Sequence, residues 1–191
     1  MLNIVIFGAP GSGKGTQSDK IIAEYGVEHI STGDVLRAEI KAGTETGKAA
    51  AALINEGKLV PDAMIIDILA STLDAKGKDI KGVIFDGFPR TIAQAEALNA
   101  MLAERGQSVS TVIGLEVDDE ELIKRIVARG ATSGRADDNA ETAKKRLNTY
   151  YSQTLPLKDF YINEGKYAKI EGVGAIDEIY AQIKKAIDAV K

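Results

Sequence analysis

The sequence predicts a three-layer α/β fold, in which a five-stranded parallel sheet is covered by helices on both faces. Two observations support this class. Short apolar runs rich in β-branched residues alternate along the 191-residue chain with longer segments of helical periodicity. A glycine-rich loop joins the first apolar run to the first helical segment, as expected at the start of a βαβ unit. Ligands of such sheets bind beyond the carboxyl ends of the strands, so the loops at that edge are the candidate site.

The expected strands are five short apolar runs at residues 2–7, 29–31, 83–85, 112–117 and 167–170. Expected helices cover residues 14–25, 34–41, 46–56, 91–105, 118–129 and 139–153, with two more beginning at Pro61 and near Ile176. Residues 46–56 are rich in alanine and are expected to bury little apolar surface, so together with residues 34–41 they are expected to form a small lobe. Pro156 is expected to kink or interrupt the segment that follows the helix at 139–153.

Composition excludes several other classes of protein. Hydrophobic residues make up 45% and charged residues 27% of the chain, a balance typical of a globular domain with one core. The formal net charge is −4, only 5% of residues are aromatic and none is Trp, so neither nucleic acid nor an anionic membrane is an expected partner. The absence of Cys excludes disulfides and thiolate metal sites. With no signal peptide and no apolar run of about 18 residues, a cytoplasmic protein is expected.

Residues 8–14 read GAPGSGK and match the spacing of a phosphate-binding loop. Its glycines allow consecutive backbone N–H groups to point at one anion, and the helix that follows presents the positive end of its dipole. Lys14 adds a charge close to the terminal phosphates of a nucleotide. The strict pattern has Ser or Thr directly after the lysine, whereas here Gly15 stands there and Thr16 follows, which leaves a hydroxyl contact to Mg²⁺ open.

Asp86 follows the apolar run 83–85 and is expected at the same edge of the sheet as the loop. A carboxylate at this place is either a helix cap or, opposite a phosphate loop, a group associated with Mg²⁺ through water. His29 is the only histidine, and no partner pattern accompanies it, so no catalytic role is expected for it.

Arginines fall in separate segments of the chain, at Arg37, Arg90, Arg125, Arg129, Arg135 and Arg146. They are either solvated surface charges or parts of a phosphate site, for which the planar guanidinium is suited. Gly130 and Gly134 favour the second interpretation, because a flexible stretch between them would let a small lid carry arginine onto a bound nucleotide. If two highly charged nucleotides were brought end to end, they would repel each other, and several cations would be needed to offset that repulsion.

Taken together, these segments resemble the adenylate kinase family almost from end to end. The resemblance rests on GAPGSGKGT at 8–16, STGD at 31–34 with Arg37, DGFPR at 86–90, RIVARG at 125–130, SGRADDN at 133–139 and Arg146. It implies one phosphate-loop kinase domain over residues 1–191, with an AMP-binding insertion at 31–60 and a short lid at 130–136. The implied reaction is the Mg²⁺-dependent conversion of ATP and AMP into two ADP. Long-lid relatives sometimes carry zinc, and none is expected here.

The resemblance also implies roles for individual residues. ATP would contact Gly11, Ser12, Gly13, Lys14, Gly15, Thr16, Arg129 and Gly174. AMP would contact Thr32, Arg37, Lys58, Leu59, Val60, Gly87, Phe88, Pro89, Arg90, Gln94, Arg135 and Arg146. The charge for catalysis would come from Lys14, Arg90, Arg125, Arg135 and Arg146, and Asp86 would be associated with Mg²⁺ through water. No residue need act as a nucleophile, because the transfer mainly requires alignment and charge stabilisation.

Two other functions stay open at this point. A UMP/CMP kinase shares the fold and the short lid, but pyrimidine-type relatives tend to have Ala and Asn where this chain has Thr32 and Gln94, and a glutamine amide is able to read an adenine edge. A nucleotide-dependent switch without phosphoryl transfer is the second, although the Asn-Lys-x-Asp guanine reader of GTPases does not occur. A monomer with ATP, AMP and ADP as partners is the expectation.

Overall fold

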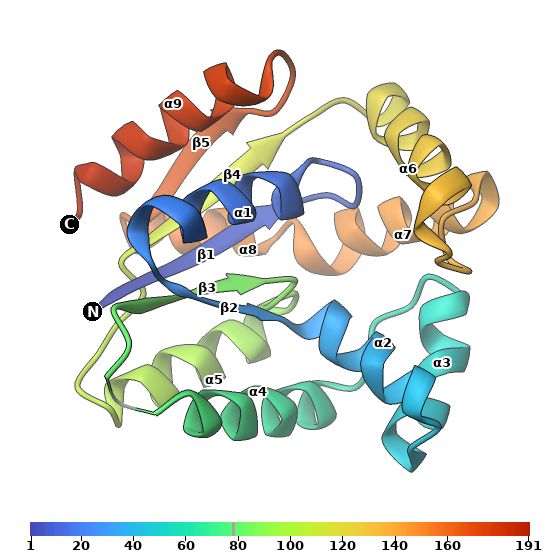
Figure 1. The fold of residues 1–191 in the computed structure, drawn as a ribbon, viewed down its shortest axis with the longest axis horizontal. Helices are drawn as coiled ribbons and strands as arrows, with labels where there is room; N and C mark the ends of the chain where they lie inside the picture. The colour runs from blue at the N-terminus through green and yellow to red at the C-terminus, as the bar shows by residue number, and fades with distance from the viewer. Residues whose placement is uncertain (78) are drawn as a thin grey trace.

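A computed structural model describes residues 1–77 and 79–191. The described residues form one sheet of five parallel strands in the order β2-β3-β1-β4-β5 (Figure 1). The strands are β1 (Leu2–Gly8), β2 (Glu28–Ser31), β3 (Gly82–Asp86), β4 (Thr111–Glu116) and β5 (Tyr167–Glu171). Each matches an expected apolar run within two residues, so the predicted fold class is confirmed.

Helical segments connect the strands. They are α1 (Lys14–Tyr25), α2 (Thr32–Ala42), α3 (Glu45–Asn55), α4 (Asp62–Lys76), α5 (Ile92–Ala103), α6 (Asp119–Ser133), α7 (Ala140–Thr149), a π-helical turn η1 (Tyr150–Thr154), α8 (Leu157–Asn163) and α9 (Ile176–Asp188). Pro156 lies at the start of α8, which is separated from η1 by Leu155 and Pro156, so the helical path is interrupted there as predicted. Within the described residues, no helix combines the length and the apolar character that crossing a membrane requires.

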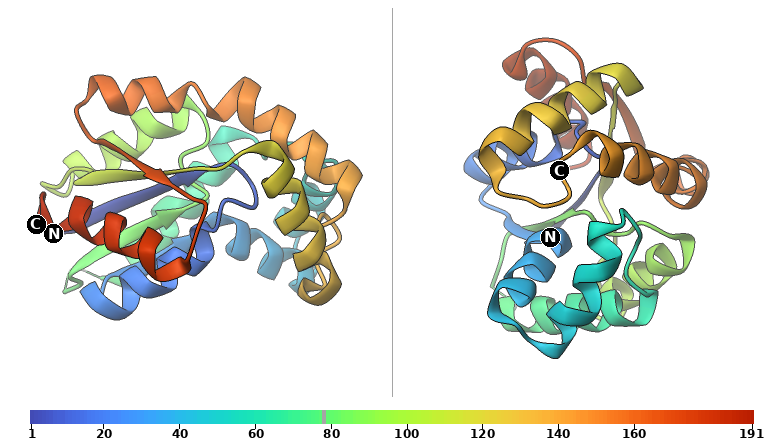
Figure 2. Two further views of the ribbon diagram at one scale, coloured as in Figure 1. Left: turned by 90° about the horizontal axis from the view of Figure 1, so that it is seen from above. Right: turned by 90° about the vertical axis from the view of Figure 1, so that its right-hand side faces the viewer.

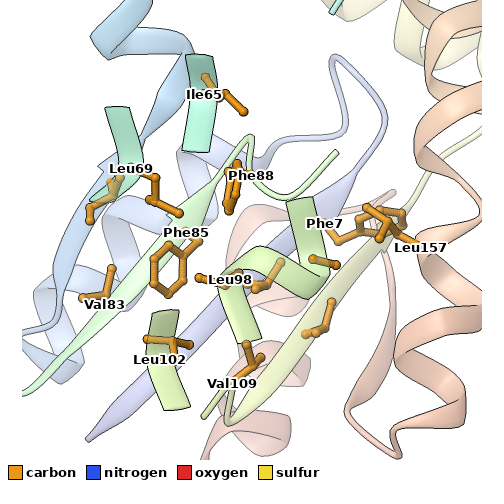
Figure 3. Close-up of a cluster of buried hydrophobic side chains, with 14 of the residues drawn as sticks. Phe7, Ile65, Leu69, Val83, Phe85, Phe88, Leu98, Leu102, Val109 and Leu157 are labelled. Atoms are coloured by element: carbon orange, nitrogen blue, oxygen red, sulfur yellow. The ribbon is translucent and has the colours of Figure 1, made fainter. Parts of the chain in front are cut away.

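Alternation along the strands gives the sheet two buried faces. Ile4 and Ile6 of β1 point to the side covered by α1 and α9, where they meet Ile21 and Ile183. Alternate residues of β1 point the other way, into a larger cluster that contains Phe85 and apolar side chains of helices α4, α5 and α8 (Figure 3). Viewed from above, the sheet lies between these two helical layers (Figure 2). Burial on both faces explains why the strands read as continuous apolar runs.

Two helical pairs stand beyond the carboxyl edge of the sheet, at the right of Figure 1. One is α2 with α3, and the other is α6 with α7. The right-hand view of Figure 2 shows them facing each other across the end of the core. Their position places any ligand at that edge between the sheet and both pairs.

The prediction that residues 130–134 form a flexible stretch is wrong for Gly130. Helix α6 continues past Arg129 to Ser133, and only Gly134, with φ +65°, ends it in the left-handed region. A Cβ atom on Gly130 would lie 2.2 Å from the carbonyl oxygen of Asp138. This glycine is therefore explained by close packing against the chain that returns toward α7, and helical backbone continues through it.

Candidate active site

Two cavities lie on either side of the phosphate loop. The larger, of about 1020 Å³ including the open space at its mouth, is lined by Gly8, Pro10 and Lys14 of the loop. The smaller, of about 620 Å³ measured the same way, is lined by Ser12 and Thr16. The loop thus forms a wall that the two cavities share.

Backbone geometry gives the loop its shape. Gly11 and Gly13 have φ values of +85° and +95°, which residues with a side chain rarely adopt. A Cβ atom on Gly8 would come within 2.8 Å of the Leu115 carbonyl on the neighbouring strand β4. Gly13 immediately precedes α1, so the N–H groups at the start of that helix face the loop. The loop therefore has the backbone shape that a phosphate cradle requires.

Lys14 is drawn back over the loop. Its Nζ donates hydrogen bonds to the carbonyl oxygens of Gly8, at 3.0 Å, and Ala9, at 3.1 Å. The pKa of Lys14 is lowered to about 8, chiefly by burial; Asp86 opposes this effect, and the nearby Arg90 and Arg146 add to it. An anion between these cations would favour the charged lysine.

Asp86 lies at the end of β3, and its side chain is 14% exposed. Its Oδ2 is 3.5 Å from Nε2 of His29, which raises the pKa of that imidazole through hydrogen bonding. No group of three or more His, Asp or Glu side chains converges as a metal site within residues 1–77 and 79–191. The donor set therefore suits Mg²⁺ held mainly by substrate phosphates and water beside one carboxylate.

Residues 87–94 form one wall of the larger cavity. The Thr32 hydroxyl donates to the carbonyl of Gly87 at 2.9 Å, and Nε of Arg90 donates to the same oxygen at 2.8 Å. Burial and the neighbouring Arg146 lower the pKa of Arg90 to about 10, so this guanidinium stays charged at neutral pH. Gln94 is 2% exposed and is held by protein hydrogen bonds while it lines the same cavity.

Carboxylates pair with the arginines of the two helical pairs and of the segment between α6 and α7. Asp34 of α2 lies 2.6 Å from Arg37 and 3.4 Å from Arg135. The second contact joins α2 to the segment between α6 and α7, across the end of the sheet.

Asp138 accepts two hydrogen bonds from Arg129, at 2.6 and 2.7 Å, and one from Ser133 at 2.8 Å. Burial alone would raise the pKa of Asp138, but these hydrogen bonds outweigh it and hold the pKa below its usual value. Arg146 lies 2.9 Å from Asp137 and 3.4 Å from Asp138. The guanidinium groups are thus neutralised and oriented by carboxylates of the protein.

Most of the predicted site residues line one of the two cavities. The larger is lined by Lys14, Thr32, Arg37, Lys58, Leu59, Val60, Gly87, Pro89, Arg90, Gln94 and Arg146. The smaller is lined by Ser12, Thr16, Arg125 and Gly174. Arg129 and Arg135 lie outside both linings, in the segment that carries Asp138. Phe88 is also outside: it is 1% exposed and belongs to the hydrophobic core (Figure 3).

Comparison with known proteins agrees with this geometry. A family model described as adenylate kinase matches residues 6–166. The chain belongs to the adenylate kinase family. It is 66% identical to an adenylate kinase of Phocaeicola vulgatus over 188 residues, which are 98% of this chain and 99% of the relative. Identity to the adenylate kinase of Parabacteroides distasonis is 62% over the full length of both, and to that of Maricaulis maris 48%, over 98% of this chain and 99% of the relative.

Membership of the adenylate kinase family makes the chain a nucleotide phosphotransferase, and it confirms the predicted family and enzyme class. The residues that the sequence prediction missed are chiefly acidic. Asp34, Asp137 and Asp138 stood inside the motifs that carried the resemblance, but their pairing with arginines depends on the fold. Asp62 follows Pro61 at the start of α4, a place where a carboxylate reads as an ordinary helix-terminal charge.

Proposed function

We propose that the chain transfers the terminal phosphoryl group of ATP reversibly to AMP, giving two ADP. The observation that carries this proposal is the position of the phosphate loop between two cavities. AMP would occupy the larger cavity, and the adenine of ATP would occupy the smaller one near Gly174. Their phosphates would then meet at the loop, beside Lys14, Arg90 and Arg146.

The chemistry proposed for these residues is electrostatic. Phosphoryl transfer needs the two reacting oxygens in line and the charge on the moving group stabilised, so a nucleophilic side chain is not required. Lys14 would contact the terminal phosphates, and Arg90 and Arg146 would neutralise charge from the acceptor side. Arg125 and Arg135 would add positive charge from the donor side and from the segment after α6.

Mg²⁺ would bind with ATP, held by phosphate oxygens and associated with Asp86 through water. The ion would neutralise part of the phosphate charge. Asp86 fits this role because its side chain lies near Lys14 at the edge of the sheet and is partly accessible. Lys14 and the loop N–H groups would orient the same phosphates.

Closure over the nucleotides is the second part of the proposal. Residues 31–60 would act as the AMP-binding lobe and residues 130–136 as a short lid. The Arg135–Asp34 contact supports this division, because it joins a residue of segment 130–136 to a residue of segment 31–60. Closure would exclude water, which would otherwise hydrolyse ATP. The working form proposed is a cytoplasmic monomer that balances ATP, ADP and AMP.

An acceptor assay tests the proposed function. Purified chain is given Mg²⁺ and ATP with AMP, GMP, UMP or CMP, and the diphosphate products are separated and measured. We expect fast turnover with AMP and little with the other acceptors. Faster turnover with UMP or CMP would favour the pyrimidine kinase. ATP hydrolysis at the same rate without any acceptor would favour a switch and contradict phosphoryl transfer.

A further inference from the structure

The side-chain amide of Gln94 is fixed from two sides. Its Oε1 accepts a hydrogen bond from the backbone N–H of Arg90 at 2.8 Å, and its Nε2 donates to Oδ1 of Asp62 at 2.8 Å. Asp62 is itself oriented, because the Thr91 hydroxyl donates to the same oxygen at 3.0 Å. The wall of the larger cavity therefore rests on a second carboxylate-centred network, separate from the arginine pairs.

This arrangement permits one orientation of the amide. A carboxylate only accepts hydrogen bonds and a backbone N–H only donates one. Rotating the Gln94 amide by 180° would place its oxygen against the Asp62 carboxylate and its NH₂ group against the N–H of Arg90. Both contacts would be mismatched in a buried place, where unmatched polar groups are costly. One N–H and one lone pair of the amide remain for a ligand in the cavity.

Purine bases differ in what they present to such an amide. The edge of adenine offers a donor at its exocyclic amine and an acceptor at N1, whereas hypoxanthine and guanine offer an acceptor at O6 and a donor at N1. An amide fixed in one orientation suits one of these patterns and opposes the other. A rotating amide would suit both in turn.

We propose that Asp62 is a specificity-determining positioning residue, which selects 6-aminopurine over 6-oxopurine acceptors by locking the orientation of the Gln94 amide. The inference rests on the proposed function, in which the acceptor base meets Gln94 in the larger cavity. Asp62 acts through Gln94 and need not touch the substrate.

The test compares AMP with IMP, which differ only at the purine edge in question. Asp62→Asn keeps the size of the side chain and can offer an NH₂ group to a rotated Gln94 amide, so it removes one of the two mismatches. We expect the ratio of kcat/KM for AMP to that for IMP to fall about tenfold. The KM for ATP should stay within about twofold, because the donor side is untouched. An unchanged AMP-to-IMP ratio in this variant would overturn the proposal.

Two further variants separate the possible causes. Asp67→Asn makes the same charge change at an exposed position of α4 and should leave the ratio unaltered. Gln94→Leu removes the amide and should also lower the ratio. If Gln94→Leu lowers it and Asp62→Asn does not, the orienting role of Asp62 is wrong while the site assignment stands. If neither variant changes the ratio, the base does not meet Gln94 and the proposed placement of AMP fails with it.

Discussion

The phosphate loop and the arginine–carboxylate cluster, both proposed here to bind phosphate groups, are built by opposite means. The loop is shaped by backbone: glycines, the start of α1, and a lysine tied to its own loop carbonyls. The cluster is made of side chains, in which Arg37, Arg129, Arg135 and Arg146 are each held by Asp34, Asp137 or Asp138. A backbone site needs no counter-charge, because its donors are partial charges fixed by the chain.

The cluster has a different requirement. Guanidinium groups close to one another repel, and burial of Arg90 and Arg146 lowers the pKa of both side chains. Carboxylates remove this penalty and set the orientation of each arginine before nucleotide binds. We therefore expect changes in the loop to affect activity alone and changes in the cluster to affect activity and stability together.

Lys14→Met is expected to have the largest effect. Removing this charge should lower kcat/KM by about 10²–10³-fold, because Lys14 would stabilise the charge on the terminal phosphates in the transition state. The free energy of unfolding, measured in urea, should be unchanged or slightly higher in the variant, since burial disfavours the charged lysine. Lys20→Met is the matched control on α1: its exposed ion pair with Asp177 contributes little, and activity should stay normal.

Arg146→Ala should lower both kcat/KM and the free energy of unfolding. Loss of the guanidinium is expected to reduce kcat/KM about 100-fold, and leaving Asp137 buried without its partner should lower the free energy of unfolding by about 2 kcal/mol. Coupled ADP assays and urea unfolding measure the two effects. Lys145→Ala, next to it on α7, removes only an exposed pair with Glu141. Unaltered stability in Arg146→Ala would contradict the contrast drawn between loop and cluster.

Gly130→Ala tests whether close packing at the end of α6 supports the cluster. The added Cβ would collide with the Asp138 carbonyl, so the segment that carries Asp138 has to move. We expect a loss of about 1–3 kcal/mol in the free energy of unfolding and about a tenfold loss in kcat/KM. Ala131→Ser adds an atom at the next, exposed position and should change neither. If Gly130 were a hinge instead, stability would be retained and only turnover would fall.

The pH dependence of Asp138 gives the smallest expected effect. Because hydrogen bonds from Arg129 and Ser133 outweigh burial and depress its pKa in the folded chain, the stabilisation is present above about pH 4 and is lost as pH falls through the folded pKa. Asp138→Asn should therefore cost about 1–2 kcal/mol at about pH 7 and progressively less toward about pH 3. Urea unfolding at a series of pH values measures this difference, and a constant gap between the two proteins would contradict it.

Apolar runs were sufficient to predict the central strands β1, β3 and β4, because these are buried on both faces of the sheet. The edge strands β2 and β5 are more exposed and include polar residues. Helix ends were less accessible to sequence reasoning. Ser31 was assigned to the end of a strand, but its hydroxyl also accepts from the N–H of Asp34 and starts α2 two residues before the predicted helix. Gly130 suggested a break because the sequence does not contain the backbone that packs against it.

Residues of the proposed site also differ in how far the sequence could predict them. Lys14 and the loop were predictable because one continuous segment builds them. Phe88 shares a motif with Arg90, yet its side chain packs in the core while that of Arg90 faces the cavity, a difference set by how the chain turns after β3. Asp62 and Asp138 were missed because their partners, Gln94 and Arg129, lie on other elements.

In the proposed function, nucleotide entry at the cluster would be an exchange of one anion for another, since its guanidinium groups already pair with carboxylates. The electrostatic gain is then the difference between a phosphate and the aspartate it displaces, rather than the full attraction of an unpaired arginine. Departure of the product is assisted in the same measure, because the aspartates compete to return. By competing for the same guanidinium groups, these aspartates would let a strongly cationic pocket bind nucleotides and still release the products.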